Sequence, residues 1–383
     1  MRLRGSPWGK EVTGVPDMAS YLERTLCDLV RVRSVTGEEA ALSEYIRDHL
    51  TRAGVSVQRD EEGNVTAEVG RGERLLVVNG HMDTVPPVDG WRADPFTPRV
   101  EDGRVYGLGA SDMKAGLACM MWLAQHVRPH VRTWFAFTNH EEGGSITPRN
   151  GVRRLIGRAR PDYAVTTEPS YDDATGRLSV GIGCQGRAIA SLTVLGRSGH
   201  SSDWRRADNA IYRGVDVITR IAAIADGLRP VEVAPGVTSV PALSVVAAHA
   251  GLADNIIPDR LRLTVDRRLS VGEDYAVFEA ELRQAAEGVN HELEISRLCL
   301  PTLADANGHT VAVAREALEK TQGVAPVQFS QGRQDLSIFA ERTRDFCNLG
   351  PGSIGQPHKA NESASVAGMV AAANALRGLI EAI

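Results

Sequence analysis

The sequence predicts an α/β protein in which helices flank a mixed, mostly parallel sheet and a smaller α+β unit is inserted into the chain. Three observations support this fold class. Helix and strand patterns alternate through the first half of the chain, as in parallel sheets that are covered on both faces. The alternation changes near residues 181–183, and a helical pattern resumes at 309–320. A length of 383 residues also exceeds what one hydrophobic core usually supports.

The first domain is expected to follow a Gly- and Pro-punctuated segment at residues 1–17. Its first helix is predicted to begin at Ser20, where Ser-Tyr-Leu-Glu forms a capping box. Residues 75–78 are too short and too apolar for a surface helix and precede Asn-Gly, so they predict a buried strand. The other elements expected here are helices at 38–53 and 113–127 and strands at 133–138 and 163–167.

The inserted domain is expected at residues 184–298, so that the first domain comprises residues 1–183 and 299–383. A Gly- and Ala-rich helix ends the second part. The elements predicted in the insertion are strands at 188–194, 244–248 and 260–267 and helices at 209–224 and 274–287.

Composition narrows the classes of function. The formal net charge of −5 is spread along the chain without a long single-sign block, which argues against nucleic acid or a membrane surface as partner. No apolar stretch approaches the roughly 18 residues that a membrane span needs, and the first residues contain no secretion-signal core. The 5 cysteines form no Cys-x-x-Cys pair, so we expect a cytoplasmic protein without a disulfide framework.

His81 and Asp83 follow the predicted strand at 75–78. Side chains two positions apart in extended backbone point the same way, so Asp83 can accept a hydrogen bond from the second ring nitrogen of His81. Such a carboxylate fixes the tautomer of a metal-ligating histidine. The alternative is a solvated turn before Pro86, with His81 exposed in the loop.

Further carboxylates lie at the ends of predicted elements. Asp112 directly precedes a helix, where an N-cap is the alternative to a ligand. Glu141 and Glu142 follow an apolar strand, and adjacent carboxylates repel each other unless a cation lies beside them; two exposed loop acids are the alternative. Glu168 follows the strand at 163–167, at the sheet edge where open α/β sheets bind ligands.

His358 lies in a Gly- and Pro-rich loop, where a single histidine would by itself indicate a solvated side chain. Mixed nitrogen and oxygen ligands suit Zn²⁺, with Co²⁺ or Mn²⁺ as alternatives. The candidate ligands are two histidines and three carboxylates: His81, Asp112, Glu142, Glu168 and His358. These candidate ligands are sufficient for two divalent ions that share one carboxylate, and Glu141 is not needed as a ligand.

These motifs resemble those of the co-catalytic zinc amidohydrolases that include acetylornithine deacetylase, succinyl-diaminopimelate desuccinylase, aminoacylase and carboxypeptidase G. The resemblance extends from the helix at Ser20 through His358 to Glu362. It implies a zinc-peptidase-like catalytic domain with an inserted lid or dimerisation domain. It also implies that Asp112 bridges two metal ions and forms a cis peptide bond with Met113. The other ligands would be His81 and Glu168 at one ion and Glu142 and His358 at the other.

The resemblance implies three catalytic positions besides the ligands. Glu141 would be the general base, and Asp83 would orient His81. His200, in Gly-Arg-Ser-Gly-His-Ser-Ser, matches a histidine that reaches the partner subunit's active site in dimeric relatives. A turn histidine on the surface of the inserted domain is the alternative for His200.

Asn255 and Arg268 match positions that hold polar groups of the substrate, often a carboxylate; an ordinary charged strand residue is the alternative for Arg268. The chain also departs from the pattern of this family. The clearest departure is Gly332-Arg-Gln-Asp335, where relatives commonly carry Gly-Thr/Ser-Asp in a loop that lines the substrate pocket. The other departures are Leu108, Ala115 and Trp204. Because of these changes, the resemblance does not determine the identity of the substrate.

The sequence therefore predicts a hydrolase that cleaves the amide bond of a small N-acyl amino acid, with a metal-bridged water as nucleophile and Glu141 as general base. A dipeptidase or carboxypeptidase of the same family is the alternative, and a metal-binding protein without catalysis is a third interpretation. The expected partners are the small-molecule substrate and a second copy of the chain, which would form a homodimer through the inserted domain.

Overall fold

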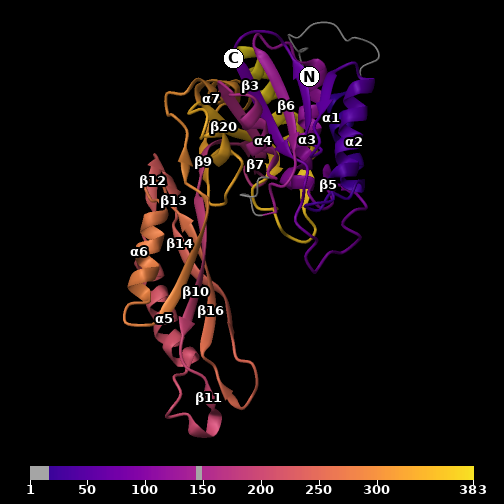
Figure 1. Cartoon of the computed structure of the whole chain (residues 1–383). Coiled ribbons are helices and arrows are strands. Elements are labelled where there is room, and N and C mark those ends of the chain that lie inside the picture. Colours follow the sequence, from indigo (N-terminus) through magenta and orange to yellow (C-terminus); the bar gives the residue numbers. More distant parts are fainter. Residues whose placement is uncertain (1–16, 144–148) are drawn as a thin grey trace.

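Two β-sheets with separate hydrophobic cores organise the chain (Figure 1). The computed structural model describes residues 17–143 and 149–383. The 10-stranded sheet and its helices form one unit, and the 4-stranded sheet extends away from that unit as an elongated arm (Figure 1). Among the helices within the described ranges, none combines the length and the apolar character needed to cross a membrane.

The central sheet has four parallel strands in its middle. Its order is β1-β2-β6-β3-β7-β20-β9-β18, in which β6, β3, β7 and β20 are parallel neighbours. β3 is buried along its whole length, as expected for a parallel strand covered on both faces. The predicted α/β class with a mostly parallel sheet is confirmed. The strands are β1 (Ser56–Arg59), β2 (Val65–Val69), β3 (Leu75–His81), β6 (Arg132–Thr138), β7 (Tyr163–Asp172), β8 (Arg177–Leu178), β9 (Val180–Cys184), β18 (Thr302–Leu303), β19 (Val327–Ser330) and β20 (Phe346–Ser353).

Helices flank this sheet. α3 and α9 pack against each other and against β20, and α1 and α7 both pack against α9. α8 contacts β7, β9 and β20, and α4 packs against α8. A small sheet of β4 (Arg99–Glu101), β5 (Arg104–Tyr106) and β21 (Ser363–Ser365) adjoins them. The helices of this unit are α1 (Met18–Arg31), α2 (Ala40–Arg52), α3 (Ala115–His126), α4 (Gly151–Arg158), α7 (His309–Gln322), α8 (Leu336–Phe339) and α9 (Val366–Ala382).

The second sheet is antiparallel and has the order β14-β16-β10-β17. α5 packs against β14 and α6, and a core that includes Leu192, Val217, Leu263 and Phe278 lies between helices and sheet. β11 lies at the far end of the arm (Figure 1). The domain limits at 183/184 and 298/299 stay a prediction. The elements are β10 (Gly186–Leu195), β11 (Gly199–His200), α5 (Ala210–Gly227), β12 (Val231–Ala234), β13 (Val237–Ser239), β14 (Ala242–Ala250), β15 (Ile256–Ile257), β16 (Arg260–Leu269), α6 (Tyr275–Ala285) and β17 (His291–Cys299).

Several predicted boundaries differ from the structure, and two of these differences have an evident cause. The first helix begins at Met18 and not at Ser20, because Asp17 is the N-cap and accepts a hydrogen bond from the backbone N–H of Ser20 at 3.4 Å. The strand predicted at 163–167 continues through Glu168 to Asp172, because its second half still pairs with β20. Residues 1–16 of the expected N-terminal segment lie outside the described residues.

β20 is the central strand that the sequence prediction misses. The glycines and prolines from Gly350 onward indicate a loop, yet Phe346–Ser353 is a buried strand. A Cβ at Gly350 would lie 2.1 Å from the carbonyl oxygen of Thr167, and one at Gly352 would lie 2.2 Å from that of Ser111. These glycines therefore permit close approach of neighbouring backbones and do not mark a turn.

We expect Gly350→Ala to lower the free energy of unfolding by about 3 kcal/mol, because the added methyl group would overlap backbone atoms that cannot move independently. Gly355→Ala, five residues further on, is the matched control, since a Cβ there meets no atom within 4 Å. Denaturant unfolding of both variants checks the prediction. Equal stability of the two variants would contradict the packing role of Gly350.

Candidate metal centre

The candidate ligands lie at one edge of the central sheet. His81 is the last residue of β3, Glu142 follows β6, Glu168 lies within β7 and His358 follows β20. Because these four strands are parallel neighbours, their carboxyl ends meet at the same edge. Asp112 reaches this edge from the irregular helical turn η1 (Ala110–Lys114), which precedes α3.

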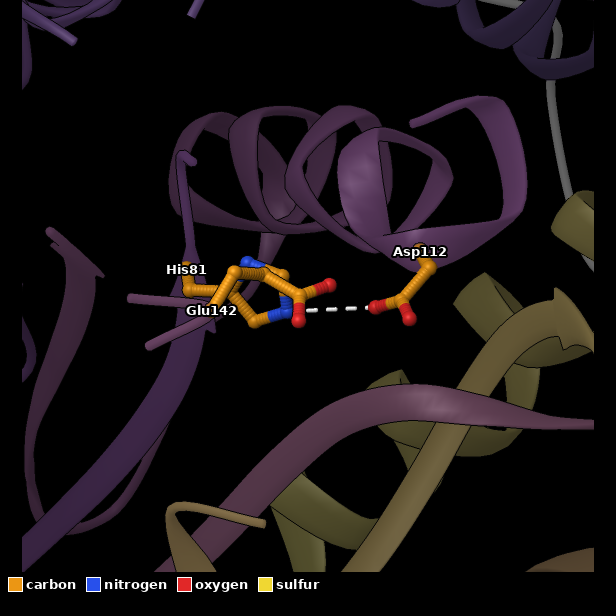
Figure 2. A group of neighbouring side chains, drawn as sticks. All are labelled: His81, Asp112 and Glu142. Atoms are coloured by element: carbon orange, nitrogen blue, oxygen red, sulfur yellow. Dashed lines mark hydrogen bonds and ion pairs between the residues drawn. The ribbon is translucent and has the colours of Figure 1, made fainter. Parts of the chain in front are cut away.

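His81 and Asp112 form the buried half of the centre. The Nε2 atom of His81 lies 3.1 Å from Oδ1 of Asp112 and 3.7 Å from Oε1 of Glu168. Figure 2 shows the His81 ring and the carboxylates of Asp112 and Glu142 turned toward one another. One ligand atom from each of these three side chains lies within 4.8 Å of the others.

His358 and Glu142 form the more open half. The Nε2 atom of His358 lies 3.0 Å from Oε1 of Glu142 and 3.6 Å from Oδ2 of Asp112. The two oxygens of Asp112 therefore face different histidines, Oδ1 toward His81 and Oδ2 toward His358. This is the arrangement that a carboxylate shared between two cations requires.

The backbone around Asp112 is held by Glu362, a residue to which sequence reasoning assigned no role. The carboxylate of Glu362 accepts hydrogen bonds from the backbone N–H groups of Gly109, Ser111 and Asp112 at 2.7 to 2.9 Å. Asp112 is not the N-cap of α3, because Lys114 holds that position, and the peptide bond between Asp112 and Met113 is cis as the resemblance implies. The only sequence signal for Glu362 was its place at the end of the His358 motif.

Asp83 acts on the centre differently from the prediction. The Nδ1 atom of His81 bonds the backbone carbonyl of Asp83 at 2.9 Å, while the Asp83 carboxylate is 3.7 Å away. That carboxylate instead accepts hydrogen bonds from the backbone N–H groups of Glu141 and Glu142 and from the Thr36 hydroxyl, at 2.8 to 3.0 Å. Its oxygens are occupied by these donors, so the residue orients His81 through its carbonyl and holds the Glu141-Glu142 turn through its side chain.

Burial and the repulsion between neighbouring carboxylates shift the pKa values of the titratable groups of the site. Burial raises the pKa of Glu141 to about 8, although the nearby Arg333 guanidinium opposes the shift. Burial and the Asp112 charge raise the pKa of Glu142. Burial alone would lower the pKa of His81, but the Asp112 hydrogen bond and the surrounding carboxylates raise it well above its ordinary value.

The donor set fits divalent cations. Four carboxyl groups lie close together around the buried imidazole of His81. They belong to Asp112, Glu141, Glu142 and Glu168. Bringing so many like charges together is costly unless cations compensate them. Carboxylate and imidazole ligands around Asp112 would hold Zn²⁺, Co²⁺ or Mn²⁺.

The centre opens into a cavity of about 380 Å³. Its lining includes all five candidate ligands and Glu141, together with the loop at residues 330–334. Arg333, which belongs to the departing Gly332–Asp335 segment, lies in this loop and pairs with Glu141 at 2.7 Å. The cavity is large enough for a small molecule.

Three predicted site residues are not brought to this cavity within one chain. His200 is exposed on β11 at the far end of the arm, where its Nδ1 bonds the Ser202 hydroxyl at 2.8 Å (Figure 1). Asn255 lies beside it and accepts a hydrogen bond from the backbone of Ser201. Arg268 lies on β16 and pairs with Asp266 at 3.0 Å.

Comparisons with known proteins identify the family of this chain. Residues 77–382 match the profile of peptidase family M20/M25/M40. The chain is 31% identical over 377 residues to succinyl-diaminopimelate desuccinylase of Xanthomonas oryzae pv. oryzae (strain MAFF 311018), an alignment that covers 93% of this chain and 96% of that protein.

Solved structures share the fold. The M20 family metallo-carboxypeptidase Sso-CP2 of Sulfolobus solfataricus superposes with a TM-score of 0.77 at 20% identity, covering 94% of this chain and 98% of that one. Bacillus subtilis YXEP, described as a dinuclear metal binding peptidase from the M20 family, superposes with a TM-score of 0.71 at 15% identity and coverage of 95% and 98%. The match over most of its length shows that this chain belongs to peptidase family M20/M25/M40.

Proposed function

We propose that this protein uses two divalent metal ions, with Zn²⁺ as the first choice, to hydrolyse the amide bond of a small N-acyl amino acid. The observation that carries the proposal is the Glu141 carboxylate, which is buried and lines the same cavity as the five candidate ligands. The likeness to a desuccinylase at 31% identity supports removal of an acyl group.

Glu141 is the proposed general base. Metal ions held by the five ligands would polarise the scissile carbonyl and lower the pKa of a water toward about 7. The Glu141 carboxylate takes a proton from the attacking water and passes it to the leaving amine nitrogen. Asp83 supports this role, because its side chain fixes the backbone N–H groups of Glu141 and Glu142.

A carboxypeptidase or dipeptidase activity is the second candidate. It is supported by the shared fold with Sso-CP2, which is described as a metallo-carboxypeptidase. The two activities differ in what lies on the acyl side of the scissile bond: an acyl group without an amine, or an amino acid. Rates on N-acetyl, N-formyl and N-succinyl amino acids against rates on dipeptides, with Zn²⁺, Co²⁺ and Mn²⁺ in turn, decide between them.

His200 is proposed to act on the active site of a partner subunit. It lies at the far end of the arm in its own chain, so a second copy is the simplest way to bring it to a metal centre (Figure 1). β14 is an edge strand, and the exposed side chains of Tyr212, Val215 and Val246 lie on α5 and β14. An open strand edge with exposed apolar residues supports dimerisation through this face.

We expect Glu141→Gln to retain its metal ions and to lose turnover by about 10³-fold, because the amide cannot accept the proton of the water. Metal analysis and kcat on a substrate of the wild-type enzyme check both parts. Glu341→Gln is the control, since this carboxylate pairs with Arg153 outside the cavity. Wild-type turnover of Glu141→Gln would remove Glu141 from the mechanism.

The bound metal should fall from near two ions per chain to about one or fewer in His358→Ala, because His358 is one of only three protein ligands assigned to its ion. Asp112→Ala should lose both ions, since it faces both histidines. Elemental analysis after dialysis measures the stoichiometry. His249→Ala, an exposed histidine on β14, should bind as much metal as the wild type; unchanged content in Asp112→Ala would contradict the shared-ligand assignment.

Mixing two inactive variants tests the action of His200 in trans. If each active site combines Glu141 of one subunit with His200 of the other, a re-equilibrated mixture of Glu141→Gln and His200→Ala chains should regain about a quarter of wild-type activity, through heterodimers with one intact site. The activity of the mixture is compared with the sum of the separate variants. An activity no higher than that sum would show that the two residues do not act across a dimer.

A further inference from the structure

Arg333 forms an ion pair with the proposed general base. Its Nη2 atom lies 2.7 Å from Oε1 of Glu141 and 2.6 Å from the backbone oxygen of the same residue. Its side chain is only 8% exposed. The guanidinium therefore already contacts one carboxylate inside the cavity and is placed to contact another.

The guanidinium of Arg333 is incompletely partnered. Its buried Nη1 atom finds no hydrogen-bond partner among residues 17–143 and 149–383. The Asp335 carboxylate is 3.9 Å from Nη1, beyond hydrogen-bond distance, and it accepts a hydrogen bond from Asn150 at 3.0 Å instead. Since a buried donor without an acceptor is costly, this side chain would gain by meeting a second acceptor.

Arg333 is also the one arginine or lysine among the described residues that line the cavity. The rest of the charged lining consists of carboxylates and the two candidate histidine ligands. An anionic group of a substrate that is not held by the metal ions would be repelled by the carboxylates and attracted only by this guanidinium. The planar fork of an arginine pairs with a carboxylate through two hydrogen bonds.

We propose that Arg333 is a specificity-determining residue that binds a carboxylate of the substrate. The inference rests on the proposed function and deepens it. The substrate carboxylate has two sources, the α-carboxylate of the amino acid and the terminal carboxylate of a dicarboxylic acyl group. A substrate without either group offers Arg333 no second acceptor.

Four substrates separate these sources: N-succinylalanine, N-acetylalanine and the alaninamides of both. Arg333→Gln should lower kcat/KM by about 10- to 100-fold for the compounds that carry the recognised carboxylate, and change it by less than about 3-fold for their counterparts that lack it. If kcat/KM falls only for the N-succinyl compounds, Arg333 binds the succinyl carboxylate. If it falls only for the compounds with a free α-carboxylate, Arg333 binds the carboxylate of the amino acid. Arg333→Lys keeps the charge without the fork and should recover part of the discrimination.

Arg153→Gln is the matched control, because this arginine pairs with Glu341 through both terminal nitrogens and lies outside the cavity. It should leave all four values of kcat/KM unchanged. Thermal unfolding shows whether Arg333→Gln is folded; if it is not, the comparison is made on Arg333→Lys, which should still favour the carboxylate-bearing compound less than the wild type does.

Equal losses on all four substrates would overturn the inference, because a residue that only positions Glu141 affects every substrate alike. Calorimetric binding of the same four compounds to metal-loaded wild type and Arg333→Gln gives a second readout that does not need turnover. If the wild type hydrolyses none of the compounds, the proposed function fails, and selective weakening of carboxylate binding in Arg333→Gln would still support the role of Arg333. Binding that is equally weakened, or not weakened, for all four compounds would reject it.

Discussion

The structure depends on keeping several carboxylates close together inside the protein at one edge of a sheet. Asp112, Glu142 and Glu168 converge on two histidines, and the buried Glu141 lies beside them. Such a cluster is unfavourable without compensating positive charge. The fold meets this constraint partly with protein groups, since the Arg333 guanidinium faces Glu141 and each imidazole contacts at least one carboxylate. The remaining excess of negative charge would be compensated by the divalent cations that the site is proposed to hold.

Two other carboxylates shape the backbone of the site without facing its cavity. Glu362 gathers three backbone N–H groups around Asp112, and Asp83 gathers two at the Glu141-Glu142 turn. Each replaces the regular hydrogen bonds that a helix or strand would have supplied, in segments that must be irregular so that ligands can turn toward one another. Each carboxyl group has two oxygens with several acceptor positions, so one side chain can hold several N–H groups at once. The ligand positions are thereby fixed by the protein itself.

The sequence was sufficient to nominate His81, Asp112, Glu142, Glu168 and Glu141, because each follows or precedes a recognisable apolar strand or helix, whereas His358 was nominated only together with this set. The parallel arrangement then brings them together, as strand ends in such sheets must. It was not sufficient to assign Glu362 and Arg333 their contacts, since these residues bond partners about 250 and 190 positions away in the chain. β20 was missed because glycine and proline mark turns more often than packed strands, and only the neighbouring backbone shows why glycine is needed. The sequence also does not reveal the hydroxyl and backbone donors that bond the Asp83 carboxylate. The predicted hydrogen bond from His81 to that carboxylate was therefore wrong.

The position of β20 has a consequence for how the chain acquires its structure. This strand lies between β7 and β9 in the central sheet, yet more than 150 residues separate it in sequence from both of them. During synthesis from the N-terminus, β7 is made long before its parallel neighbour and has an unpaired edge until residues 346–353 leave the ribosome. The arm, whose strands are consecutive between residues 186 and 299, can pair internally during that interval. The candidate ligands on β3, β7 and the segment after β20 can therefore come together only once β20 has been made, so the candidate site is completed together with the central sheet.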